Sequence, residues 1–363
     1  MNQKLWPAVA GSALCLAGMA QAGGIERTTQ SSSILFAQGN RIELSYAHVS
    51  PSVTGTAVTP IGNVAKDYGL PGFAIKIDAT EKLSFALIYD TPFGADVLYD
   101  PLNPVLGGTL AQAETQALTA LARYKLTDRV SVFGGIRQQR AEGEITLNGA
   151  AYGALTGYNV QLDSDWATGY VLGAAYEIPD IALRIALTYN SAITHNFSTT
   201  ENIAPGVTSS TEVKTPQSVN LDFQTGIAPD TLLMASVRWA EHSAFQIQPA
   251  TFGALTGGGL VSLDDTTTYT LGVARRFTPA FAASISFGYE KEGDPLVSPL
   301  APSTGRKSIS VGASYKFNER VELSAGVSKV WLGDAQPATA GTARGSFDNN
   351  SVTAFGMKIA YTF

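Results

Sequence analysis

The side chains best suited to acid and base chemistry near neutral pH are three histidines, His48, His195 and His242. They fall on different expected strands or strand ends, and none stands in a recognisable nucleophile motif. No cluster of acidic residues or histidines has the spacing of metal ligands. The sequence therefore predicts no catalytic residue, no metal and no cofactor, and it argues against an enzyme.

Basic side chains could instead bind an anionic head group. By strand alternation, Arg137, Arg238 and Lys316 lie on the face that we expect to point inward. A ligand with a carboxylate and an alkyl chain needs an apolar track and one or two cations that orient its head group. We therefore expect these three residues to contact such a ligand. The alternative is a set of solvated charges that pair with Asp222 or Glu290.

The elements that would carry these residues are strands with a two-residue period. Residues 354–363 alternate between large apolar side chains and small or polar ones, and they end on Phe363. The same alternation recurs at 181–190, 219–227, 283–290 and 308–317. Residues i and i+2 of a strand share a face, so each strand has one face suited to hydrocarbon and one suited to water. The small, Ser-rich and Gly-rich polar faces favour a barrel wall around a wet lumen over a buried sandwich.

The connections between these strands are of two kinds. Short turns rich in Pro, Asp, Asn or Thr are expected at 79–82, 127–129, 178–180, 228–231, 278–280 and 318–319. Long loops are expected at 50–71, 91–113, 148–163, 201–213, 247–262, 293–304 and 333–344. Their alternation predicts an all-β fold, a transmembrane antiparallel β-barrel of about 14 strands.

The first residues and the composition define the context. Residues 1–22 contain Lys4, an apolar core and Ala20-Gln21-Ala22, the parts of a cleavable secretory signal, so the mature chain should begin at Gly23. The single cysteine, Cys15, lies inside that core, which leaves the mature chain without a thiol. With 15% charged residues and a net charge of −6, the chain is not expected to bind nucleic acid. No later stretch has the ~18 consecutive apolar residues of a membrane helix.

Residues 23–40 precede the first expected strand and lack a strand period. The run Ile34-Leu35-Phe36 is too apolar for a comfortable disordered tail. A barrel of this size also has a lumen wide enough to hold a plug. We therefore expect a short N-terminal hatch at 23–40 inside the lumen of a barrel formed by 41–363; a disordered periplasmic tail is the alternative.

Five short runs are spread along the mature chain. They are Gly24-Ile25-Glu26-Arg27-Thr28-Thr29-Gln30-Ser31-Ser32-Ser33, Glu43-Leu44-Ser45-Tyr46, Val49-Ser50-Pro51, Asp90-Thr91-Pro92-Phe93-Gly94 and Ala360-Tyr361-Thr362-Phe363. Together they resemble the FadL/TodX family of outer-membrane transporters, and their order and spacing agree with the strand count. The sequence departs from the family in its short N-terminal stretch, which contains no Asn-Pro-Ala.

The resemblance implies an outer-membrane barrel that passes long-chain fatty acids or hydrophobic hydrocarbons without energy input. In that family the third strand is kinked inward, and the ligand leaves sideways through the resulting gap. The residues that match are Gly23, Gly24 and Ile25 in the hatch and Pro92, Phe93 and Gly94 at the kink. Independently, proline lacks a ladder donor and glycine marks a bend, so this strand end should be irregular. An ordinary exit from strand to loop is the alternative.

The resemblance also implies an arginine on the upper fifth strand that contacts the ligand carboxylate. Arg140 matches that stretch best. Strict alternation would place Arg140 on the lipid side unless the strand is bulged. Arg137 and Arg140 are therefore rival candidates.

Two external loops contain near-identical apolar runs, at 152–157 and 252–257, and a third loop is apolar over 97–106. Exposed apolar patches usually mark binding sites, so these loops could capture a hydrophobic ligand. The expected capture residues are Leu98, Tyr99, Tyr152, Leu155, Phe252 and Leu255. Loops that pack on one another to cover the pore would have the same composition.

These observations lead us to expect a monomeric channel for passive uptake of hydrophobic small molecules, long-chain fatty acids first among them, in contact with outer-membrane lipid. A nonspecific water-filled porin is the main alternative. A porin would need a strongly charged constriction and no plug, which the low charge content and the apolar N-terminal segment do not favour. An outer-membrane lipid hydrolase is the alternative from the enzyme class.

Overall fold

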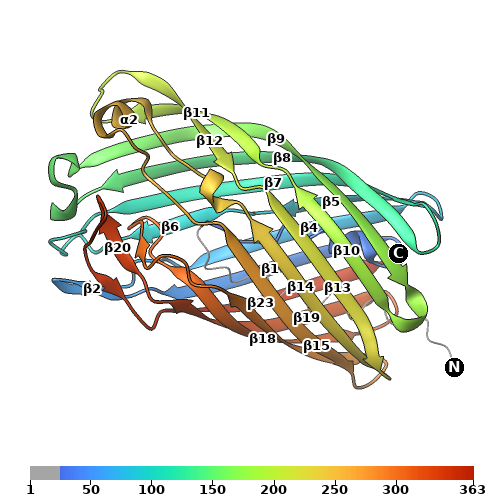
Figure 1. Ribbon diagram of the computed structural model, residues 1–363. Helices are drawn as coiled ribbons and strands as arrows, with labels where there is room; N and C mark the ends of the chain where they lie inside the picture. The colour runs from blue at the N-terminus through green and yellow to red at the C-terminus, as the bar shows by residue number, and fades with distance from the viewer. Residues whose placement is uncertain (1–24) are drawn as a thin grey trace.

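The computed structural model describes residues 25–363; the predicted signal segment 1–22 and the hatch residues Gly23 and Gly24 lie outside the described residues. Within residues 25–363, fourteen antiparallel strands close a barrel (Figure 1). They are β1 (Arg41–Ser52), β4 (Tyr68–Asp78), β5 (Leu83–Asp90), β7 (Leu110–Lys125), β8 (Val130–Leu147), β9 (Tyr158–Ile178), β10 (Leu183–Asn190), β13 (Ser218–Ala228), β14 (Thr231–Ala240), β15 (Thr266–Arg276), β16 (Phe281–Glu290), β18 (Thr304–Lys316), β19 (Val321–Gly333) and β23 (Ser351–Thr362). The first and last strands pair along their whole length, which closes the wall. The predicted fold class is confirmed.

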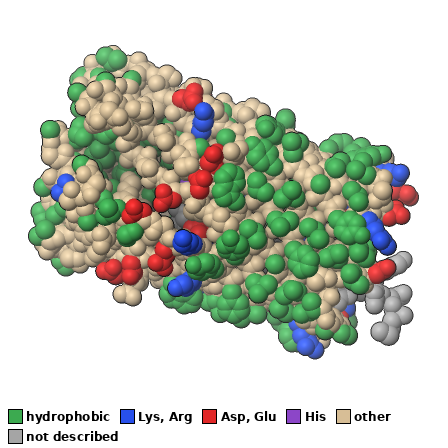
Figure 2. Space-filling view, in the orientation of Figure 1, with side chains coloured by type: hydrophobic (Ala, Val, Ile, Leu, Met, Phe, Trp, Pro, Cys, Tyr) green, Lys and Arg blue, Asp and Glu red, His purple; other side chains and the backbone are tan. Residues whose placement is uncertain are grey.

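The alternation read from the sequence sets the two faces of this wall. In β23, Phe355 and Met357 are exposed on the outside, whereas Ala354 and Lys358 are buried on the inside. Hydrophobic side chains cover the strand wall on the face seen in Figure 2. A closed barrel leaves no strand edge unpaired and presents apolar side chains outward, which is the arrangement that a lipid bilayer accepts.

The two ends of the barrel differ as predicted. The short turns gather at one end and the long connections at the other (Figure 1). The long connections contain β2 (Gly55–Ala57), β3 (Thr59–Ile61), β17 (Leu296–Val297), β20 (Gln336–Thr339), β21 (Thr342–Ala343), β22 (Ser346–Phe347), helix α2 (Ala250–Thr256) and the 3-10 turns η2 (Ala150–Leu155) and η4 (His242–Ala244). No helix in residues 25–363 combines the length and the apolar character that a membrane span requires.

Some predicted boundaries are wrong. The loop expected at 91–113 is interrupted by β6 (Gly94–Leu98), which continues the third strand along β7. The strand expected from Ile181 begins at Leu183, because the 3-10 turn η3 (Pro179–Ile181) ends on Ala182 in the left-handed conformation, with φ 52°. The loop expected at 201–213 is shorter, because β11 (Ile193–Glu201) and β12 (Thr208–Thr215) form a hairpin beyond the end of β10.

The first described residues, 25–36, contact inward-facing side chains of the wall. Ser33–Phe36 form the 3-10 turn η1, in which Ile34, Leu35 and Phe36 are buried. The guanidinium groups of Arg123 and Arg184 lie 4.4 and 4.7 Å from the centroid of the Phe36 ring. Cation–π contacts of this kind stabilise an aromatic ring beside the polar inner face. The apolar run that was too hydrophobic for a free tail therefore has partners inside the barrel.

Candidate ligand pockets and wall opening

The third wall strand is broken where the sequence places Pro92-Phe93-Gly94. Both β5 and β6 pair with β7, with Asp90 opposite Ala117 and Gly94 opposite Glu114. Three residues, 91–93, therefore stand opposite two residues of β7, which is the count of a β-bulge. The Thr115 hydroxyl donates to the Phe93 carbonyl at 2.7 Å and accepts from the Phe93 amide at 2.9 Å, so it satisfies the backbone at the break.

A gap in the hydrogen-bonded wall lies beside this break. The ladder between β4 and β5 runs from Phe73 opposite Tyr89 to Asp78 opposite Ser84 and pairs nothing in 68–72. A bridge between Ala65 and Val97 bounds the gap on the loop side. We call this gap, between 68–72 of β4 and 91–94 of the third strand, the wall window. Pro92, Phe93 and Gly94, the residues expected at the kink, lie on its third-strand side.

The N-terminal segment occupies the open edge of the third strand at this window. Glu26 and Phe93 form an antiparallel bridge, the Arg27 amide donates to the Pro92 carbonyl at 2.8 Å, and the Gly94 amide donates to the Ile25 carbonyl at 2.8 Å. These bonds give the broken strand the partners that β4 does not supply.

Arg27 lies across the window. Its guanidinium stands 4.4 Å from the centroid of the Tyr68 ring, on the β4 side. On the other side, a Cβ added to Gly94 would lie 2.5 Å from Cζ of Arg27. Only glycine lets the guanidinium approach the third strand this closely.

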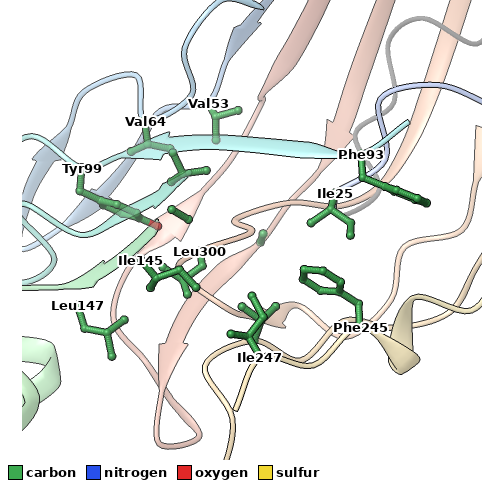
Figure 3. Close-up of a cluster of buried hydrophobic side chains, with 14 of the residues drawn as sticks. Ile25, Val53, Val64, Phe93, Tyr99, Ile145, Leu147, Phe245, Ile247 and Leu300 are labelled. Atoms are coloured by element: carbon green, nitrogen blue, oxygen red, sulfur yellow. The ribbon is translucent and has the colours of Figure 1, made fainter. Parts of the chain in front are cut away.

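An apolar pocket of about 70 Å³ lies next to the break. Its apolar lining comes from the N-terminal segment, the wall and the loops: Ile25, Phe93, Ala111, Ala113, Ile145, Leu162, Phe197, Val213, Phe245, Ile247, Val261 and Leu300. Figure 3 shows Ile25 and Phe93 close to Phe245 within this cluster. Among the described residues that line it, Glu142, Glu144 and His195 are titratable, and none is lysine or arginine.

His195 is a lining residue that the sequence did not single out as part of a site. It is fully buried, its Nδ1 lies 3.1 Å from Oδ2 of Asp165, and its Nε2 lies 3.1 Å from Nε2 of Gln139. The ring stacks on Phe197 with centroids 5.4 Å apart. Phe197 is two residues along the same strand, β11, whereas Asp165 and Gln139 come from β9 and β8, so local spacing could not have indicated these two partners.

A larger cup of about 920 Å³ opens among the external loops. Tyr152, Leu155 and Phe252 of the two repeated runs line it. Val261 and Leu300 line both the cup and the apolar pocket. The two cavities therefore adjoin, and the apolar pocket reaches Phe93 and Gly94 beside the wall window.

The other predicted capture residues lie elsewhere. Tyr99 is fully buried in the loop core, where its hydroxyl donates to the Pro299 carbonyl at 2.9 Å and its ring packs against Phe347. Leu98 lies in β6 and does not line the cup, and Leu255 is 66% exposed on the outside of α2. These three residues cover the barrel or face water.

The predicted cations have protein partners. Arg238 is buried on the inward face, and its Nε donates to Oε1 of Glu26 at 2.9 Å. Arg137, also inward and buried, donates from Nε to the Thr119 hydroxyl at 2.8 Å. Sequence reasoning missed Glu26 as the partner of Arg238, because the two residues are 212 positions apart.

The remaining two cations do not line the apolar pocket, although Arg140 pairs with the lining residue Glu142. Arg140 lies on the outward face, as strict alternation required, and forms an ion pair with Glu142 two residues along β8. Lys316 lies at the end of β18, beside the turn that contains Glu319 and Arg320. Neither residue lines the cup or the apolar pocket.

The sequence model of a family described as outer membrane protein transport protein (OMPP1/FadL/TodX) matches residues 14–363. A comparison with curated protein sequences gave no match.

Solved structures with the same fold include a Pseudomonas aeruginosa FadL homologue, which is 15% identical with a TM-score of 0.75 over 98% of each chain. The Pseudomonas putida toluene transporter TodX is 13% identical, with a TM-score of 0.68 over 97% of this chain and 98% of that one. The Ralstonia pickettii toluene transporter TbuX is 13% identical, with a TM-score of 0.65 over 98% and 99%. At these identities the likeness shows a shared fold.

Proposed function

Because this chain belongs to the outer membrane protein transport family (OMPP1/FadL/TodX), an outer-membrane β-barrel family, we propose that it is a passive channel for small hydrophobic molecules. The observation that carries the proposal is the adjoining series of cup, apolar pocket and wall window, with Val261 and Leu300 shared by the two cavities. An apolar molecule gains free energy by leaving water at each step, so no energy input is needed.

The proposed route begins in the cup, where Tyr152, Leu155 and Phe252 offer apolar surface to a molecule arriving from outside. The ligand then moves into the apolar pocket beside Phe93 and leaves sideways through the wall window into the membrane. A water-filled lumen would oppose this movement of an apolar solute, whereas a lateral exit keeps it in contact with apolar surface throughout.

The N-terminal residues 23–40 are proposed to act as the hatch. Of the expected hatch residues, Ile25 lines the apolar pocket, and Arg27 beside it lies across the window. Movement of this segment would therefore change both the pocket and the exit. The buried pair of Glu26 and Arg238 would hold the hatch in its closed position.

The ligand class that these cavities suit best is uncharged. No lysine or arginine among the described residues lines the apolar pocket, and Glu142 and Glu144 stand at its edge. A carboxylate there would be buried without a cation, which is costly. Long-chain fatty acids, the ligand expected from the sequence, are the rival ligand class. Their carboxylate would need an inward cation, and Arg137 is the candidate. The toluene transporters among the structures of the same fold are consistent with an uncharged ligand.

Uptake into proteoliposomes tests the proposal. We expect the purified protein to speed the transfer of a labelled hydrocarbon across the bilayer while it passes few ions in planar-bilayer recordings. Large, steady ion currents without hydrocarbon transfer would instead identify a nonspecific porin. Empty liposomes and liposomes with an unrelated barrel are the controls for direct partitioning into lipid.

A further inference from the structure

The lining of the cup contains two buried polar side chains, each of which has one polar atom without a hydrogen-bond partner among the described residues. His242, in η4, is 1% exposed, and its Nδ1 lies 3.2 Å from the Thr266 hydroxyl. Glu290, the last residue of β16, is 3% exposed, and its Oε2 accepts from the Thr268 hydroxyl at 2.6 Å. Both residues line the cup.

The other polar atom of each side chain has no partner among residues 25–363. These atoms are Nε2 of His242 and Oε1 of Glu290. Buried polar groups are almost always hydrogen-bonded, because a buried donor or acceptor without a partner loses its hydrogen bonds to water and gains none in the protein. Two such atoms on residues that line one cavity therefore point to a polar group on the molecule that the cavity receives.

The two side chains are held by neighbouring inward positions of one strand, β15 (Thr266–Arg276). Thr266 and Thr268 are two residues apart on β15, so their side chains share the inward face and stand roughly 7 Å apart along the strand. Thr266 holds His242 and Thr268 holds Glu290. A single small polar group can therefore lie between the imidazole and the carboxylate.

The charges that line the cup decide the class of this group. Asp264, Asp265 and Asp294 line the cup, with Lys291 as the single basic lining residue among those described, so a carboxylate is repelled. Glu290 already forms an ion pair with Arg306 at 3.2 Å, so its charge is compensated and an added ammonium group would meet Arg306. An uncharged polar group can hydrogen-bond to Nε2 of His242 and to Oε1 of Glu290, and it is repelled neither by the aspartates nor by Arg306.

The protonation of His242 agrees with a neutral partner. Burial lowers the pKa of His242; the carboxylate of Glu26 opposes this shift and Arg238 adds to it. The imidazole is therefore neutral at neutral pH. When Nδ1 accepts from the Thr266 hydroxyl, Nε2 carries the proton and is a donor.

We propose that His242 and Glu290 form a binding site for the hydroxyl group of an uncharged hydrophobic molecule, an alkanol or alkylphenol. The hydroxyl oxygen accepts from Nε2 of His242, and its proton is donated to Oε1 of Glu290. The alkyl or aryl part lies against the apolar lining of the cup, such as Val261 and Leu300. The inference rests on the proposed channel function and names the ligand class that the channel prefers.

Calorimetric titration of the detergent-solubilised protein with ligands of equal chain length tests this site. The probes are a 1-alkanol, the n-alkane, the alkanoate and the alkylamine, all at neutral pH. We expect the alkanol to bind about tenfold more tightly than the alkane, because the alkane leaves both buried atoms unmet. Equal binding of alkanol and alkane, tighter binding of the alkanoate or amine, or no binding by any probe would overturn the inference.

Variants separate the hydroxyl site from general damage to the cup. His242→Leu should bring alkanol affinity down to that of the alkane and leave alkane affinity unchanged, and His242→Gln, which keeps a hydrogen-bonding group, should retain part of the preference. Ser210→Ala, at an exposed position of β12 that lines neither the cup nor the apolar pocket, is the matched control. Equal loss for both ligands in His242→Leu would contradict the assignment.

Glu290→Gln tests the second partner without a change of shape, and the intact barrel is checked by its resistance to unfolding in detergent. We expect it to weaken alkanol binding and not alkane binding. Uptake of the same probes, measured in parallel, distinguishes failure of the hydroxyl site from failure of the channel function. If all probes cross the bilayer at equal rates, the hydroxyl site is wrong and the channel stands; if none crosses, the channel function itself is wrong.

Discussion

Arg238 on β14 and Glu26 in the N-terminal segment form an ion pair that is buried on both sides, with Nε of Arg238 2.9 Å from Oε1 of Glu26. The same guanidinium donates to the Thr29 carbonyl at 3.2 Å and to the Ser218 hydroxyl at 3.0 Å. One wall residue thus holds the segment that also lies across the wall window. Several consequences can be measured.

Glu26→Gln should loosen the N-terminal segment while the barrel stays closed. Breaking a buried ion pair by removing one partner costs about 3 to 5 kcal/mol, because the other charge stays buried. We expect faster hydrogen exchange at the amides of Arg27 and Gly94, which bond across the window. Asp230→Asn, which removes an ion pair with Arg276 at an exposed turn, is the control and should leave exchange at the window unchanged. Unaltered protection in Glu26→Gln would mean that the pair does not hold the segment.

Gly94→Ala should displace Arg27 from the window, because the new Cβ would lie 2.5 Å from Cζ of Arg27. If Arg27 obstructs the lateral exit, both Gly94→Ala and Arg27→Ala should raise the rate of hydrocarbon uptake. Gly62→Ala adds a Cβ with no neighbour within 4 Å and is the matched control. Slower uptake in Arg27→Ala would argue that this side chain guides the ligand and does not block it.

Ala113→Phe should fill the apolar pocket, whose volume is about 70 Å³. We expect hydrocarbon binding to fall about tenfold or more, because the added ring occupies the space that the ligand needs. Ala283→Phe places the same ring on the outward face of β16 and should bind as the unmodified chain does. The comparison is made by titration of both purified variants. Equal affinities for the two variants would remove the pocket from the route.

The loop helix α2 should depend on the ionisation of Glu201. Its carboxylate accepts from the amides of Thr251 and Phe252, each at 2.8 Å, and from the Tyr158 hydroxyl at 2.9 Å. Burial opposes ionisation, but these donors outweigh it and hold the pKa of Glu201 below its ordinary value of 4.5.

Because the pKa of Glu201 is lower in the folded state, its carboxylate contributes fully to stability at pH values above its pKa in the unfolded chain. This contribution is lost as the pH falls through the pKa of Glu201 in the folded chain. We therefore expect proteolysis of the 250–256 loop to increase only in strong acid in the unmodified chain. Glu201→Ala should show the increase at neutral pH, because the cap of α2 is worth about 1 kcal/mol. Glu212→Ala, an exposed residue of the same hairpin, is the control. Resistance of Glu201→Ala to the protease would show that α2 is held by packing.

The sequence predicted the wall well because a barrel strand records its environment in every second residue. The alternation at 308–317 and 354–363 placed the two faces correctly, and the inward positions of Arg137 and Arg238 followed from the same rule. The turn residues then fixed the strand count. Strict alternation also placed Arg140 on the outward face, where it pairs with Glu142 two residues away.

The candidate sites could not be predicted in the same way, because they depend on contacts between distant segments. Glu26 meets Arg238 across 212 positions, and His195 lies between strands that periodicity treats separately. The residue types at Pro92 suggested an irregular strand end. They could not show that residues 68–72 of β4 lack pairing with the third strand, because strand pairing depends on distant segments. Loop packing decided that Tyr99 is buried and Leu255 exposed.

The most direct test of the central claim is a crystal structure of the protein soaked with a brominated hydrocarbon, read by the anomalous signal of bromine. The account predicts bromine in the cup, in the apolar pocket beside Phe93 and Val261, and at the wall window between β4 and the third strand. Bromine confined to the outer lipid-facing surface, or ordered only along the polar lumen, would contradict it.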